Sequence, residues 1–340
     1  MAKKVGIPRG LFYYQFYPLW KTFFEELGAE LIVSDYTTKK ILDDGVKACV
    51  DEACLPVKLY HGHVINLKDR VDYLFIPRFT SISRNEYICP KFGGLPDMIR
   101  NNFENLPEII DTEINLRKSK RNALRSALKI GRFFCTDSIK IRRVYKNAVK
   151  AYRQFRKQIK SGKLPSDILN TWDSEKFMDG SAKLQGLPTE AHFLTIAVIG
   201  HAYNLYDAYI NMNMLNKFKA NGVKIITIDM IDSKIINKLS RTLPKRMFWN
   251  YGRRALGSAL HIIERGDVDG MICVMSFGCG VDSFVCDMIE RRIKRNSDIP
   301  FITLTIDEHS GEAGMDTRIE AFIDMIRWRG RNENHIPAFG

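Results

Sequence analysis

Three cysteines of the sequence stand where a helix or a strand should end, each beside proline or glycine. The three motifs are Asp51-Glu-Ala-Cys-Leu-Pro56, Tyr87-Ile-Cys-Pro-Lys91 and Ser276-Phe-Gly-Cys-Gly280, which contain Cys54, Cys89 and Cys279. Glycine lets the backbone adopt positive φ and approach a neighbouring group closely, and Cys54 stands where a helix would have to stop before proline. Thiolates bind iron–sulfur clusters, and backbone N–H groups near the sulfurs tune them. Position alone leaves two interpretations open, cluster ligands or thiols in tight turns.

The other four cysteines fit ordinary packing. Cys273 lies inside an apolar strand, and Cys286 lies in the helix that follows. Cys49 on a helix and Cys135 in a packed segment are explained as small buried thiols. Seven cysteines without a Cys-x-x-Cys pair and without an export signal argue against a disulfide framework, a zinc ribbon and a thioredoxin-like redox site.

The elements that must position the three cysteines recur in two halves of the chain. In the first half, a strand at residues 3–9, an aromatic turn at 11–17, a helix at 18–27 and a strand at 30–35 follow one another. In the second half the same order returns at residues 193–201, 202–209, up to about 220, and 223–229. Third strands at 71–77 and 268–274 and fourth strands at 106–114 and 299–307 complete the correspondence. The two aromatic turns are expected to pack the halves together rather than to form a substrate pocket.

Strands that alternate with helices of ordinary length are typical of βαβ units and a parallel sheet. The predicted fold class is therefore α/β, with two similar doubly wound parallel-sheet domains and a basic helical insert between them. We expect the first α/β domain at residues 1–116, the insert at 117–190 and the second α/β domain at 191–340.

The positive charge of the chain belongs to the insert. Residues 117–163 contain 17 Lys or Arg and one acid, Asp137, a net charge of +16, whereas the whole chain carries +13, so that the rest carries 13 − 16 = −3. A solvated helical connector explains this segment, and a docking surface for a protein partner is the alternative. Neither an aromatic stacking platform nor a DNA-reading motif accompanies the charge, which argues against a nucleic-acid partner.

Several polar residues follow strands of the two halves. In open parallel sheets the ligand crevice lies outside the carboxyl ends of the strands. The candidates for a substrate pocket at this edge are Arg9, Arg78, His201 and Glu312. Glu308 and His309 follow the last strand and are candidate proton donors, although residues of the same turn could instead cap the next helix.

Hydropathy and the N-terminus bear on location. No apolar run reaches the length of about 18 residues that a membrane span requires. Residues 1–10 run directly into a strand pattern and lack the apolar region of a signal peptide. We expect a cytoplasmic protein without a membrane partner.

Further motifs carry a resemblance to a known superfamily. They are Gly6-Ile-Pro-Arg-Gly-Leu11, Asp51-Glu-Ala-Cys-Leu-Pro-Val-Lys58, Phe75-Ile-Pro-Arg78, Tyr87-Ile-Cys-Pro-Lys91, Trp249-Asn-Tyr-Gly252, Ser276-Phe-Gly-Cys-Gly280 and Asp307-Glu-His-Ser-Gly-Glu-Ala-Gly314. Together they resemble the stand-alone, acyl-CoA dehydratase activase-related branch of the 2-hydroxyacyl-CoA dehydratase-like superfamily, which is related to double-cubane cluster proteins. The likeness covers both α/β halves and is least distinctive in the insert.

The resemblance implies an oxygen-sensitive metal centre and its partners. Cys54, Cys89 and Cys279 would hold a [4Fe–4S] cluster with one open iron, or half of a sulfide-bridged [8Fe–9S] double cubane shared across a homodimer. Electrons would come from an ATP-dependent activase. The chain itself lacks the Gly-x-x-x-x-Gly-Lys-Ser/Thr pattern of a P-loop, so it would accept electrons and reduce a small molecule or an acyl-CoA.

Three alternatives stay open at this point. The chain could be a 2-hydroxyacyl-CoA dehydratase subunit, although no independent sequence feature marks a CoA pocket. It could be a non-catalytic structural metal protein with zinc on three thiolates and a fourth ligand such as His201, although structural zinc ligands usually come in close-spaced pairs. It could also bind nucleic acid through residues 117–163, which predicts strongly salt-dependent retention.

Overall fold

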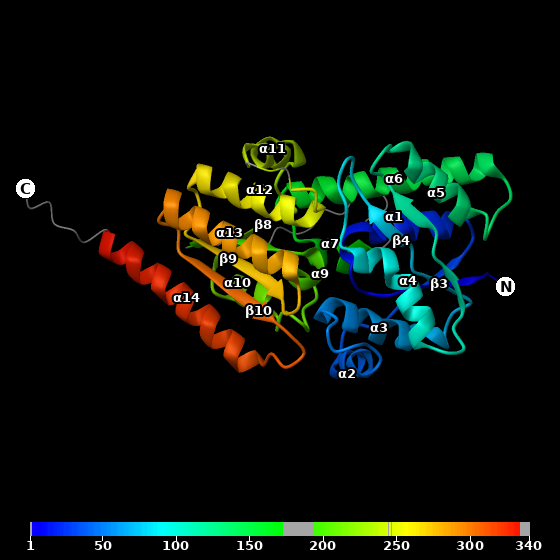
Figure 1. The fold of residues 1–340 in the computed structure, drawn as a ribbon, viewed down its shortest axis with the longest axis horizontal. Coiled ribbons are helices and arrows are strands. Elements are labelled where there is room, and N and C mark those ends of the chain that lie inside the picture. The colour runs from blue at the N-terminus through cyan, green and yellow to red at the C-terminus, as the bar shows by residue number, and fades with distance from the viewer. Residues whose placement is uncertain (1, 173–193, 244, 246, 334–340) are drawn as a thin grey trace, which may run out of the picture.

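The computed structural model describes residues 2–172, 194–243, 245 and 247–333, and it contains two four-stranded parallel sheets (Figure 1). The first sheet has the order β2 (Glu30–Val33), β1 (Lys4–Ile7), β3 (Tyr73–Phe75) and β5 (Glu108–Ile110). The second has the order β8 (Val223–Thr227), β7 (Leu194–Gly200), β9 (Gly270–Ser276) and β10 (Phe301–Ile306). Numbered within each half, both sheets run second, first, third, fourth. The repeat predicted from the sequence is confirmed in the strand order.

Continuous apolar runs explain why these segments form central strands. In β7, Ile196, Val198 and Ile199 are fully buried although they point to alternate faces of the sheet. Strands that are covered on both faces read as apolar runs rather than as alternating patterns. The helices that flank each sheet supply this cover, which confirms the doubly wound α/β fold.

The helices alternate along the chain with the strands of both sheets, as in βαβ units. The first half contains α1 (Tyr13–Glu26), α2 (Lys39–Lys47), α3 (Leu55–Lys68) and α4 (Pro90–Asn102). The second half contains α9 (Ala202–Leu205), α10 (Met214–Ala220), α11 (Ser233–Leu239), the 3-10 helix η1 (Ser240–Thr242), α12 (Asn250–Arg265), α13 (Gly280–Asn296) and α14 (Glu312–Glu333). Within the described part of the chain, no helix combines the length and the apolar character needed to span a bilayer.

Both predicted aromatic turns contain helix. The helix α1 begins at Tyr13, because the carbonyl of Phe12 accepts the N–H of Phe16 at 2.9 Å, so Pro18 lies inside this helix and not near its start. Likewise, Tyr203 belongs to the short helix α9. Their role in packing the halves together is confirmed by a ring contact of 6.3 Å between Tyr14 and Tyr206.

A small two-stranded sheet was absent from the prediction. It pairs β4 (Arg78–Ser81) with β6 (Glu113–Asn115), in parallel. These strands are short and largely polar, so no apolar run marks them. β4 leads from the first sheet toward α4, and this is the connection that carries Cys89.

The insert is helical as far as it is described. It contains α5 (Arg121–Gly131), α6 (Ser138–Lys160) and α7 (Pro165–Trp172). Ala148, Phe155 and Ile159 are buried along one side of α6, as their spacing predicts. The far end of α6 reaches the second half, where Lys160 pairs with Asp232 at 2.6 Å. Residues 173–193 and 334–340 of the predicted insert and second domain lie outside the described residues, and the division at 116 and 190 stays a prediction.

One pair of cysteines contradicts the expectation of free thiols. Cys273 on β9 and Cys286 on α13 are both buried, as predicted, but they form a disulfide across 13 residues. The pairing arises because α13 packs back on the strand that precedes it, which brings its second turn over β9. Sequence spacing alone did not indicate this bond.

The close crossing of α2 and α3 yields a stability prediction. A Cβ on Gly62 of α3 would stand well inside van der Waals contact with the carbonyl of Ile41 on α2. The substitution Gly62→Ala should therefore push the helices apart and lower the free energy of unfolding by about 1 to 3 kcal/mol. The measurement is urea unfolding followed by circular dichroism. Gly314→Ala, on α14 with open space around it, is the control and should be neutral or stabilising. Equal effects of the two would contradict the close crossing.

Candidate metal centre

Each of the three candidate cysteines directly precedes a helix. Cys54 is the N-cap residue of α3, Cys89 of α4 and Cys279 of α13, and all three are half-buried. None of these caps has a side-chain hydrogen bond. The first N–H groups of a helix have no partner inside it, and this end carries the positive end of the helix dipole. The three sulfurs therefore stand at helix ends that favour negative charge.

Cys54 starts a helix instead of ending one. The helix α2 ends at Lys47, and Cys49 lies in the turn after it, so the expectations of a helix stop at Cys54 and of a helical Cys49 were wrong. Pro56 falls in the first turn of α3, where a missing N–H costs nothing. Pro56 therefore marks the start of α3. The sequence alone did not decide whether this proline ends the preceding helix or begins the next one.

The cysteines of the two halves face each other. A Cβ added at Gly278, which precedes Cys279, would stand 3.7 Å from the Cα of Cys54. Burial raises the pKa of the Cys54 thiol, and Cys89 adds to the rise. Burial also raises the pKa of Cys279 to about 12, and Asp282 and Cys54 contribute further. In the absence of a cation, burial and the neighbouring groups thus favour the neutral thiol of Cys54 and of Cys279 over the thiolate.

A histidine and an aspartate stand beside Cys279. Ligand atoms of His201, Cys279 and Asp282 lie within 4.8 Å of one another, so this group can hold a metal ion. His201 Nε2 lies 2.7 Å from Asp282 Oδ1, and Asp282 Oδ2 is buried without a hydrogen-bond partner. His201 was predicted for the site, but Asp282 was missed. The sequence feature that could have identified Asp282 is an acidic residue three positions after Cys279, in the first turn of the predicted helix.

Aromatic rings enclose this group. The ring of His201 lies 4.9 Å from Tyr203 and 4.5 Å from Tyr251, centroid to centroid. Burial raises the pKa of Tyr203 well above its usual value, with a further rise from Asp282. Such a surrounding excludes water and strengthens the interactions of any charge placed in it.

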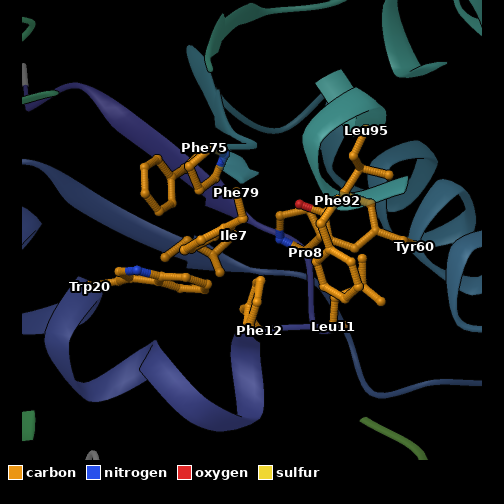
Figure 2. Close-up of a pocket in the computed structure, with 12 residues that line it drawn as sticks. Ile7, Pro8, Leu11, Phe12, Trp20, Tyr60, Phe75, Phe79, Phe92 and Leu95 are labelled. Carbon is orange, nitrogen blue, oxygen red and sulfur yellow. The ribbon is translucent and has the colours of Figure 1, made fainter. Parts of the chain in front are cut away.

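On the first-half side, apolar side chains fill the edge of the sheet. Figure 2 shows Ile7 of β1, Phe12 just before α1, Phe79 of β4 and Phe92 of α4 converging on a small cavity. Its volume is about 20 Å³, which leaves room for about one water molecule. This cavity is core packing and offers no substrate pocket.

An ion pair joins the two halves next to the cysteines. Lys58 of α3 lies one turn after Cys54, is almost fully buried, and pairs with Glu308 at 2.5 Å. Burial alone would raise the pKa of Glu308, but the hydrogen bond and charge of Lys58 outweigh it and hold this pKa below 4.5. Lys58 was not singled out in the sequence, because its partner is 250 residues away.

The remaining predicted residues lie in different surroundings. Arg9 stacks over Tyr36 at 4.0 Å and lines a cavity of about 170 Å³ between the halves. Arg78 pairs with Asp97 on α4 and with Asp111. His309 is exposed, and its N–H donates to Asp307. Glu312 is also exposed, and it pairs with Lys217 of α10 at 2.7 Å.

These features define an α/β protein with two matching parallel sheets and a thiol-lined centre where the sheets meet. The chain belongs to the family described as CoA enzyme activase uncharacterised domain (DUF2229), which matches residues 4–231. Residues 212–326 match the family of the 2-hydroxyglutaryl-CoA dehydratase, D-component. The predicted kinship with 2-hydroxyacyl-CoA dehydratase-like, activase-related proteins is thereby confirmed. No curated protein matches the chain.

The Lys58–Glu308 pair yields a pH-dependent prediction. Because the pKa of Glu308 is depressed, its stabilisation is present above pH 4.5 and is lost as the pH falls through the folded-state value. Glu308→Gln leaves Lys58 buried without a charged partner and should cost about 1 to 3 kcal/mol at pH 7. The difference from the parent chain should shrink as the pH falls below 4.5, as measured by urea unfolding across pH.

Glu312→Gln is the matched control. Its side chain is 67 % exposed, so loss of its ion pair with Lys217 should cost well under about 1 kcal/mol. If both variants lose the same stability, or if the Glu308→Gln difference grows toward acid, the interpretation of the pair is wrong.

Proposed function

We propose that this protein is an iron–sulfur redox protein with an acyl-CoA dehydratase-like activity. It accepts low-potential electrons from an ATP-dependent activase and reduces a small molecule or an acyl-CoA. Cys54, Cys89 and Cys279 hold the cluster. The observation that carries the proposal is the placement of these cysteines at three helix N-termini that meet where the two sheets face each other.

The residues at the centre fit such a group. Three thiols are the ligands that iron–sulfur clusters take in proteins, and free N–H groups at helix starts suit the anionic sulfurs. The protein ligands of a cluster bind different iron atoms, so the three sulfurs can lie farther apart than the ligands of a single metal ion. When bound, a cluster of this kind supplies one-electron transfer and an iron without a protein ligand, or a sulfide bridge to a second cluster in a homodimer.

The chain's own residues control protons and water around the centre. Tyr203 and Tyr251 exclude solvent, while Asp282 keeps His201 oriented through their 2.7 Å contact. In the proposal, His201 contacts substrate, and His309 is the proton donor in the turn after β10. Glu308 is ionised and held by Lys58, so it positions this turn and donates no proton. Arg9 contributes to substrate binding from the cavity that it lines. Arg78 and Glu312 are engaged in ion pairs and are given no contact with substrate.

Metal analysis of cysteine variants tests the cluster. The protein is purified without oxygen, supplied with iron and sulfide, and analysed for iron and acid-labile sulfide. We expect about four of each per chain, and about half an extra sulfide if two cubanes are bridged across a homodimer. Cys279→Ser, like the same change at Cys54 or Cys89, should lose most of the iron. Cys135→Ser, a half-buried cysteine of the insert, is the control and should keep it. Equal iron in Cys279→Ser and Cys135→Ser would refute the assignment.

Optical and EPR spectra separate a dehydratase from a small-molecule reductase. If an acyl-CoA is the substrate, 2-hydroxyacyl-CoA added to the reduced protein should shift the cluster's EPR signal, because substrate would reach the iron that lacks a protein ligand. Free CoA is the control. A spectrum that acyl-CoA leaves unchanged, in protein that an activase with ATP still reduces, would favour a small-molecule substrate.

A second candidate is a mononuclear metal site on His201, Cys279 and Asp282. It is favoured by the mutual distances of their ligand atoms, within 4.8 Å, and by the unpaired Asp282 Oδ2. Zinc accepts such nitrogen, sulfur and oxygen ligands. This function predicts about one zinc per chain, no labile sulfide, and loss of the metal in Asp282→Asn, whereas the cluster keeps its iron in that variant.

A further inference from the structure

A polar cavity lies beside the loop that leads to Cys89. Its volume is about 440 Å³, and its walls come from the loop before α4, from α11 with η1, and from α12. Its polar and charged lining includes Arg84, Asn85, Glu86, Asn237, Arg241 and Arg253. Leu243 is the one apolar residue among those that line it. The cavity is distinct from the cysteine centre and from the cavity at Arg9.

A buried ion pair fixes the back of this cavity. Arg253 is buried and pairs with Glu86 at 2.7 Å, and its guanidinium also reaches Asn237. Asn250 donates to the same carboxylate at 2.5 Å. Arg253 and Glu86 therefore neutralise each other, and because both are held from two sides, the wall that they form is rigid.

Two further arginines supply uncompensated charge. Arg84 comes from the loop before α4 and Arg241 from η1. Both are exposed and have no ion-pair partner among the residues that the structure describes. The lining thus carries three arginines against one carboxylate, a formal excess of two positive charges. Arginine presents several N–H donors in a planar fork, which matches the oxygens of a phosphate.

The size and polarity of the cavity narrow the class of ligand. Inorganic phosphate would fill a small part of the volume, which is of the size that nucleotide-sized ligands occupy. All but one of the lining residues are polar or charged, so the cavity suits a polar ligand better than a fatty acyl chain, and the side-chain amides of Asn85 and Asn237 suit a ribose or a base. We infer that this cavity binds a nucleoside phosphate, with its phosphate between Arg84 and Arg241.

The location gives the site a structural link to the cysteine centre. The backbone of Tyr87, the residue after Glu86, donates to Phe248 and accepts from Asn250, and Cys89 follows two residues later. A ligand that contacts Arg84 and Asn85 therefore acts on the segment that positions Cys89. Both a free nucleotide and the nucleotide end of CoA contain the nucleoside phosphate that this cavity would bind.

Calorimetric titration of the full chain, without any metal, tests this inference independently of the proposed redox function. The probes are ADP, adenosine 3′,5′-bisphosphate, CoA and, as the uncharged control, adenosine. We expect the phosphorylated probes to bind, adenosine to bind at least about tenfold more weakly, and the affinity to fall as salt is raised. Binding of CoA and the bisphosphate but not of ADP would identify CoA as the source. Binding of ADP as tightly as of CoA would identify a free nucleotide.

Variants locate the site. Arg241→Ala and Arg84→Ala should each weaken binding by about tenfold to a hundredfold, the loss of a charged hydrogen bond, while Arg241→Lys should lose less. Both arginines are exposed, so the fold should be kept, which circular dichroism checks. Arg318→Ala is the control, an exposed arginine on α14, which packs on the opposite face of the second sheet from α11. No binding by the parent chain, or equal binding by Arg241→Ala, Arg84→Ala and Arg318→Ala, would overturn the inference.

Discussion

The structure depends on the way in which the carboxyl edges of its two parallel sheets face each other. In a βαβ unit, the helix that follows a strand begins at the carboxyl edge, so its unpaired N–H groups and the positive end of its dipole lie there. Two such edges placed opposite each other concentrate positive potential in one place. The N-termini of α4 and α13 come from matching positions in the two halves, and α3 adds a third. Cys54, Cys89 and Cys279 occupy these three ends.

Such an arrangement would be unstable without groups that hold the edges together. The contacts across the interface are of two kinds. The first is aromatic and apolar, as between Phe92 and Tyr203. The second consists of buried ion pairs, Lys58 with Glu308 and Arg253 with Glu86. Buried pairs add little net stability, but they penalise any packing in which one partner is left alone, so they fix how the two halves meet.

The same interface separates two chemical surroundings. Around Cys279 the walls are aromatic and dry, which keeps thiols protonated and favours a ligand that brings its own positive charge. Around Arg84 and Arg241 the walls are polar and open, which favours an anion. The loop from Arg84 to Cys89 connects the two, and its backbone pairing with Trp249 makes it a part of both.

The sequence by itself determined the features that depend on local order. Apolar runs located the strands, the repeated order of elements predicted two matching sheets, and proline and glycine beside Cys54, Cys89 and Cys279 marked element boundaries, although not that Cys54 begins a helix. Only the tertiary structure decided which distant groups meet. Asp282 beside His201, Lys58 beside Glu308 and the Cys273–Cys286 bond depend on how helices pack over strands and how the two sheets face each other. Hydrophobic patterns constrain which face of an element is buried, but they carry no information about which polar group stands opposite.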